Sequence, residues 1–160
     1  MITFITGLKN SGKSTYLYEW FKKEPIGSGV ISIKRYVENI HIGYDLLLLP
    51  SCKQIQLCTL LSPTHITQAE DLIQGKFIFE KGIFEKSSQY ISENLPQKGK
   101  PIWIDEIGLL EVEGKGFMPI LKEISSLEYD MRIGVRLSCV YQIARMLHNN
   151  HIHIIYATSG

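Results

Sequence analysis

Residues 7–14 read Gly7-Leu8-Lys9-Asn10-Ser11-Gly12-Lys13-Ser14 and match the phosphate-binding loop pattern G-x-x-x-x-G-K-[ST]. Residues 1–6, which precede the loop, predict a buried β-strand, and residues 15–21 predict the start of a helix. A strand, a glycine-rich loop and a helix N-terminus together form an anion site from backbone N–H groups and the helix dipole. The stretch therefore predicts binding of a nucleoside triphosphate with magnesium (Mg²⁺).

Each position of this Walker A loop has an expected role. Gly7 and Gly12 carry no Cβ atom, so the backbone can turn tightly and approach phosphate. Lys13 is expected to place its charge on the β and γ phosphates, and the Ser14 hydroxyl to bind magnesium. Thr15 adds a hydroxyl near the α phosphate. The expected phosphate-contacting set is Gly7, Leu8, Lys9, Asn10, Ser11, Gly12, Lys13, Ser14 and Thr15.

The composition limits the class of protein. The chain has 160 residues and a net charge of +1, which predicts one domain over residues 1–160 and no nucleic-acid partner. The leucine run at residues 46–49 is too short to cross a bilayer, so no membrane partner is expected. Residues 1–14 form a core strand and a loop rather than a signal peptide, which predicts a cytoplasmic protein. The three cysteines have no CxxC spacing and predict neither a disulfide framework nor a zinc site.

Strands and helices alternate along the chain. Periodicity and turn residues predict strands over residues 30–36, 42–49, 54–60, 101–104, 131–135 and 152–156, and helices over residues 80–95, 117–124 and 140–147, the last with Ser138 as its cap. Residues 62–75 are expected to form an irregular loop or lid. This order predicts an α/β three-layer sandwich with a mainly parallel sheet. An antiparallel hairpin is expected as an insertion after the first strand–helix unit.

A second motif lies at Ile102-Trp103-Ile104-Asp105-Glu106, an apolar strand that ends in two carboxylates and has the Walker B form. Ligands of α/β sheets bind beyond the carboxyl ends of strands. Asp105 is therefore expected to face the magnesium held by Ser14. An acid directly after the magnesium aspartate can orient and polarise a water molecule, which predicts Glu106 as the catalytic carboxylate beside Lys13.

The sequence does not decide which further basic side chains lie near the phosphates. A guanidinium can stabilise the charge that builds up during phosphoryl transfer. Arg136 follows the strand predicted at residues 131–135 and is one candidate, and a surface arginine without contact to phosphate is the alternative. Arg35 is a second candidate. Lys9 lies inside the loop and is expected either beside the phosphates or in solvent.

The block Asp105-Glu106-Ile107-Gly108, followed by Leu109-Leu110-Glu111, resembles the D-E-I-G-x-M-E block of the small P-loop nucleoside-triphosphatase family that includes the cancer-related nucleoside-triphosphatase. Phe117 and the hairpin at residues 29–48 are also similar to that family. The resemblance implies a RecA-like core, a requirement for magnesium and slow hydrolysis of several nucleoside triphosphates. It assigns residues 7–15 to phosphate, Asp105 to magnesium and Glu106 to catalysis.

The chain departs from the family pattern at several positions. Lys34 stands where the hairpin of the family has a glutamate, and the following arginine position is shifted or lost. Leu109 and Leu110 replace a proline and a methionine. These departures leave hydrolysis as the leading hypothesis but do not define its rate or the preferred base.

Three functional hypotheses follow. The first is magnesium-dependent hydrolysis of nucleoside triphosphates, ATP or GTP among them, to the diphosphate and phosphate. The second is a small-molecule kinase that phosphorylates a nucleotide or nucleoside. The third is a nucleotide-dependent switch in which the hairpin at residues 30–49 and the loop at residues 62–75 move or bind a protein partner, whose identity the sequence does not give.

Overall fold

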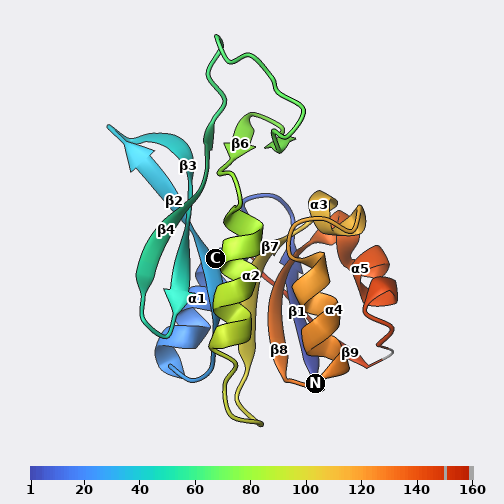
Figure 1. Ribbon diagram of the computed structural model, residues 1–160. Coiled ribbons are helices and arrows are strands. Elements are labelled where there is room, and N and C mark those ends of the chain that lie inside the picture. Colours follow the sequence, from blue (N-terminus) through green and yellow to red (C-terminus); the bar gives the residue numbers. More distant parts are fainter. Residues whose placement is uncertain (150, 159–160) are drawn as a thin grey trace.

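The computed structural model describes residues 1–149 and 151–158. Its strands form one sheet, and helices pack on both faces of it (Figure 1). The elements in chain order are β1 (Ile2–Gly7), α1 (Lys13–Lys23), β2 (Ser28–Val37), β3 (Ile40–Leu49), β4 (Lys53–Leu60), β5 (Ile73–Gln74), β6 (Phe77–Phe79), α2 (Ile83–Glu93), β7 (Ile102–Ile107), α3 (Leu109–Val112), α4 (Met118–Ser126), β8 (Met131–Arg136), a 3-10 turn (Leu137–Cys139), α5 (Val140–Met146) and β9 (Ile152–Tyr156).

The sheet is mixed rather than mainly parallel. Its strand order is β5-β6-β4-β3-β2-β7-β8-β1-β9. Neighbouring strands in the run β2-β7-β8-β1-β9 are parallel. Neighbouring strands in the run β5-β6-β4-β3-β2 are antiparallel. Short turns join β2 to β3 and β3 to β4, and such turns force antiparallel neighbours. The prediction of a mainly parallel sheet is therefore wrong for the half that contains β3 to β6.

The predicted antiparallel hairpin is present and follows the first strand–helix unit, and its strands belong to the sheet. Residues 28–30 of β2 pair in parallel with residues 102–104 of β7. The remainder of β2 continues past the end of this pairing and forms the antiparallel ladder with β3. The hairpin thus extends a central strand, and its free end projects from the body of the protein at the upper left of Figure 1.

Two apolar clusters hold the layers together. Helix α1 packs Leu17 and Phe21 against Trp103 on one face of the sheet. Helices α2, α4 and α5 cover the other face. Strand β1 is buried on both sides, because Phe4 contributes to the second cluster and Ile5 to the first. This double burial fixes the strand that leads into the phosphate-binding loop.

Other boundaries differ from the predictions. The expected loop at residues 62–75 ends in the short strand β5, which pairs with β6. Ser138 does not cap the last helix: it lies in the 3-10 turn, Cys139 occupies the N-cap, and the Ser138 hydroxyl is 3.8 Å from the Cys139 sulfur. The chain turns once more before α5 begins, which moves the cap by one residue. Among the described residues, no helix has the length and apolarity needed to cross a membrane.

Candidate functional site

The phosphate-binding loop joins β1 to the N-terminus of α1. Gly12 occupies the N-cap with φ +84°, a left-handed conformation that glycine adopts without a Cβ clash. Asn10 is also left-handed, with φ +61°, and Ser11 N–H donates to the Leu8 carbonyl at 3.1 Å. Because Gly12 has no side chain to cap α1, the first N–H groups of the helix are available to an anion.

A cavity of about 1470 Å³ opens at this loop. Of the nine residues expected to contact phosphate, all but Ser11 line it; they are Gly7, Leu8, Lys9, Asn10, Gly12, Lys13, Ser14 and Thr15. The Ser11 hydroxyl is buried and lies where a Cβ atom on Gly7 would stand. Asp105 and Glu106 line the same cavity, so the structure brings the two sequence motifs to one place.

A β-bulge in β7 sets the directions of the two carboxylates. Ile104 pairs with Ile133 and Ile107 pairs with Val135, so β7 carries one extra residue between these points. Glu106 lies within the bulge and has φ +66°, a left-handed conformation that is costly for a residue with a side chain. Such strain at non-glycine residues is concentrated at functional sites.

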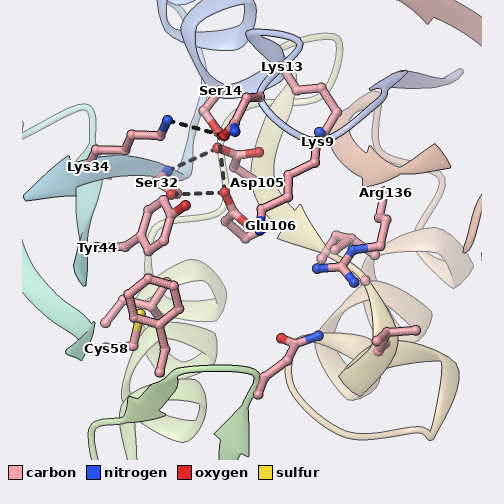
Figure 2. A pocket seen from close by; sticks show the side chains of 18 of the residues that line it. Lys9, Lys13, Ser14, Ser32, Lys34, Tyr44, Cys58, Asp105, Glu106 and Arg136 are labelled. Atoms are coloured by element: carbon pink, nitrogen blue, oxygen red, sulfur yellow. Dashed lines mark hydrogen bonds between the residues drawn. The ribbon is translucent and has the colours of Figure 1, made fainter. Parts of the chain in front are cut away.

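The bulge places both carboxylates at the start of α1 and beside β2. Glu106 Oε1 accepts hydrogen bonds from Ser14 Oγ at 3.4 Å and from Ser32 Oγ at 3.1 Å. Asp105 Oδ2 accepts from the Ser32 N–H at 3.2 Å. Figure 2 shows these side chains converging below the phosphate-binding loop. Ser32 therefore positions both acids, a role that the sequence did not reveal beyond its match to the hairpin pattern.

The two acids differ in their surroundings. Asp105 is 1% exposed, whereas Glu106 is exposed to the cavity. Burial, followed by the nearby charge of Glu106, raises the pKa of Asp105 above its ordinary value. A divalent cation next to Asp105 would favour its ionised form, and carboxylate and hydroxyl oxygens are ligands that suit magnesium.

Gly134 of β8 has no side chain, and the Asp105 carboxylate occupies the space next to its Cα atom. A Cβ atom at this position would stand 2.1 Å from Asp105 Oδ1 and 2.9 Å from Leu17 Cδ1. The role of Gly134 was not predicted from the sequence. Its signal was present, because a glycine inside a strand often marks the close approach of another group.

Basic side chains surround the acids. Lys9, Lys13, Lys34 and Arg136 all line the cavity (Figure 2). Lys13 Nζ lies 3.4 Å from the Leu8 carbonyl, and Lys34 Nζ lies 3.4 Å from Asn10 Oδ1. Lys34 replaces the glutamate of the family pattern, so the hairpin adds a positive charge beside the loop. The cavity thus combines several cations with two central carboxylates.

Of the two candidate arginines, Arg136 lines the cavity and Arg35 does not. Arg136 ends β8 and lines the cavity. Arg35 instead forms an ion pair with Asp45 at 3.0 Å and donates to the Cys58 carbonyl at 3.3 Å. Its guanidinium is therefore engaged within the hairpin, and Arg136 is the arginine that the structure brings to the phosphate-binding loop.

Glu111 anchors the segment that follows the acids. Its side chain is 2% exposed and accepts hydrogen bonds from the Gly108 N–H at 2.8 Å and the Phe117 N–H at 3.0 Å. Burial raises the pKa of Glu111. The segment from Gly108 to Phe117 is thereby folded back on itself at the cavity edge, which gives a structural reason for a glutamate at this position of the block.

Comparisons with known proteins agree with the fold. No family model matches the chain, and no curated protein is significantly similar to it in sequence. The solution structure of a human cancer-related nucleoside triphosphatase is similar, with a TM-score of 0.70 and 19% identity over 97% of this chain and 87% of that one. The crystal structure of THEP1 from the hyperthermophile Aquifex aeolicus has a TM-score of 0.64 and 18% identity over 99% of this chain and 90% of that one. The resemblance inferred from the two motifs is therefore confirmed at the level of the fold, and this chain has a mixed α/β fold similar to those of the two proteins.

Proposed function

We propose that this protein is a magnesium-dependent nucleoside-triphosphate phosphohydrolase. The observation that carries the proposal is the bulge in β7, which places Glu106 within hydrogen-bonding distance of Ser14 in the phosphate-binding loop. One similar structure is that of a protein named as a nucleoside triphosphatase. The RecA-like core is part of the proposal, and it is supported by the position of β8 between β1 and β7.

The residues present fit a magnesium ion. Ser14 and Asp105 would hold it, directly or through water, and their oxygen atoms are the donors that it prefers. The burial of Asp105 supports this assignment, since a buried carboxylate is stabilised in its ionised form by a nearby cation. When bound, magnesium would neutralise charge on the β and γ phosphate oxygens.

The protein side chains would divide the remaining work. Glu106 would orient a water molecule and accept its proton as the water attacks the γ phosphorus. Lys13 would neutralise the charge that develops toward the leaving diphosphate. Arg136 faces the same cavity and would stabilise charge on the transferred phosphoryl group. The helix dipole of α1 adds a fixed partial positive charge.

Phosphate release from ATP, GTP, CTP and UTP tests this proposal. With magnesium we expect slow release from more than one of these nucleotides, because the resemblance of the two motifs to the nucleoside-triphosphatase family implies the use of several nucleoside triphosphates. Chelation of magnesium with EDTA should abolish the release, and excess magnesium should restore it. Absence of phosphate release from all four nucleotides in the presence of magnesium would refute the phosphohydrolase assignment.

Replacement of Lys13 by alanine should weaken nucleotide binding. The variant loses one charge-assisted contact to phosphate, which is worth about 1.5–3 kcal/mol, or roughly a tenfold to hundredfold change in affinity. Equilibrium titration with a fluorescent ATP analogue measures this change. Lys53→Ala, which removes an exposed lysine from the start of β4, is the control and should bind normally. Affinity equal to wild type in Lys13→Ala would count against the loop assignment.

A further inference from the structure

The cavity continues beyond Glu106 into a region that we call the aromatic compartment. Its walls are formed by Tyr44, Cys58, Phe77, Phe79, Phe84 and Phe117. Neighbouring rings are in contact, with centroids 5.5 Å apart for Tyr44 and Phe77 and 5.1 Å apart for Phe84 and Phe117. Phe84, Phe117 and Cys58 are buried, whereas Tyr44, Phe77 and Phe79 are partly exposed. The compartment thus has an apolar floor and exposed ring surfaces.

The position of this compartment makes it distinct from the phosphate site. In the proposed nucleotide site, Lys13 and Ser14 would direct the γ phosphate toward Glu106, because Ser14 Oγ lies 3.4 Å from Glu106 Oε1. Cys58 lies beyond Glu106 as seen from the phosphate-binding loop, and Tyr44 lies beside Glu106 (Figure 2). The nucleoside part of a bound triphosphate is attached at the α phosphate, at the opposite end of the chain of phosphates, and therefore points away from the aromatic rings.

The cavity is also larger than one ligand requires. Its volume is about 1470 Å³, whereas small-molecule sites usually measure about 300–1,000 Å³. A triphosphate occupying the loop would leave the aromatic compartment accessible. A second ligand in the compartment would meet the γ phosphate at Glu106, which is the position of a phosphoryl acceptor.

We propose that the aromatic compartment binds a nucleoside, whose sugar hydroxyl accepts the γ phosphoryl group. The proposal rests on the proposed nucleotide site and specifies a second substrate for it. The hydroxyl oxygen forms a bond to the γ phosphorus, and the bond from this phosphorus to the β,γ-bridging oxygen breaks. The hydroxyl proton passes to the Glu106 carboxylate, and the electron pair of the broken bond leaves with the nucleoside diphosphate. The products are a nucleoside monophosphate and a nucleoside diphosphate.

The chemistry of the lining favours this class of ligand. A planar base can stack on aromatic rings, and such stacking tolerates any base. Burial raises the pKa of Tyr44 to about 12 and that of Cys58 to about 11, so both groups are uncharged at neutral pH. Gln74 supplies an amide to the lining, and amides can pair with the polar edge of a base. Lys76 also lines the cavity, and its Nζ lies 5.6 Å from the centroid of the Phe77 ring. A flat ligand with a free hydroxyl fits these surroundings.

The test is phosphoryl transfer from γ-labelled ATP with magnesium to adenosine, guanosine, cytidine, uridine and thymidine. We expect labelled nucleoside monophosphate from at least one of them, and none from the corresponding free bases, which have no sugar hydroxyl. ATP binding and phosphate release are measured in the same samples. Release of labelled phosphate without any labelled monophosphate would overturn the acceptor proposal and leave the hydrolase proposal intact. Absence of ATP binding would refute the nucleotide site itself, and the acceptor proposal with it.

Two variants connect transfer to the compartment. Phe77→Leu keeps an apolar side chain but removes a stacking surface. The nucleoside concentration that gives half-maximal transfer should therefore rise at least about tenfold. Tyr44→Phe keeps the ring, and therefore the packing, but removes the hydroxyl donor. The nucleoside concentration that gives half-maximal transfer should rise in this variant as well. Tyr141→Leu, which removes a 71% exposed ring from α5, is the matched control and should behave as wild type. Transfer that is insensitive to both Phe77→Leu and Tyr44→Phe would place the acceptor elsewhere and overturn the proposal.

Discussion

Replacing Glu106 with glutamine should lower phosphate release by about 10²- to 10⁴-fold, the usual contribution of a positioned general base. Glutamine has nearly the same size and retains an oxygen that can accept from Ser14 and Ser32, so the local geometry should persist. It cannot take a proton from water. Nucleotide affinity should therefore stay within about twofold of wild type, since loss of a transition-state contact need not change ground-state binding.

Single-turnover phosphate release and equilibrium binding measure the two quantities separately. Glu113→Gln is the matched control, because Glu113 is an exposed glutamate close in sequence that pairs with Lys115 on the surface. It should show wild-type values in both assays. Wild-type turnover in Glu106→Gln would exclude a water-positioning role for Glu106, whatever its effect on binding.

Local patterns were sufficient to predict that the loop and the two acids lie together in the fold. The loop at residues 7–14 and the acids at 105 and 106 depend on short stretches of sequence in which each residue type has a physical role. Their convergence follows from a general rule, that parallel strands present their carboxyl ends at one edge of the sheet. The fold resemblance to two solved structures agrees with this inference.

The geometry that directs the acids could not be predicted in the same way. A regular strand would send residues 105 and 106 to opposite faces, and the extra residue in β7 becomes apparent only from its pairing with β8. The bonds from Ser32 to both carboxylates join positions more than 70 residues apart. Such contacts depend on the packing of β2 beside β7, which no local pattern encodes.

The antiparallel half of the sheet illustrates a second limit. Hydrophobic periodicity identified β2, β3 and β4 as strands, and the turn after β2 indicated that β2 and β3 form a hairpin. It did not reveal that β4 pairs with β3 and β6. Short strands such as β5 and β6 contain too few residues for a period to be visible. Their pairing adds Phe77 and Phe79 to the cavity wall. Because this pairing could not be predicted, the aromatic compartment could not be predicted either.

Replacing Gly134 with alanine should disable the site without touching any phosphate-binding residue. The added Cβ atom would stand 2.1 Å from Asp105 Oδ1, so the carboxylate or the β8 backbone must move. A displacement of about 1 Å in a catalytic group can cost about 100-fold in rate, and we expect a loss of at least that size in phosphate release. Overpacking should also reduce the free energy of unfolding by about 1–3 kcal/mol.

A double-mutant cycle with Asp105→Ala distinguishes this mechanism from general damage to the core. If the clash is with the Asp105 carboxylate, Gly134→Ala should destabilise the wild-type protein clearly more than the Asp105→Ala variant, in which the methyl group has space. Some cost should remain, because Leu17 Cδ1 also lies 2.9 Å from the new atom. Denaturant unfolding of the four proteins gives the coupling energy. Equal destabilisation in both backgrounds would mean that Gly134 is required by the α1 packing alone, and that the position of Asp105 does not depend on it.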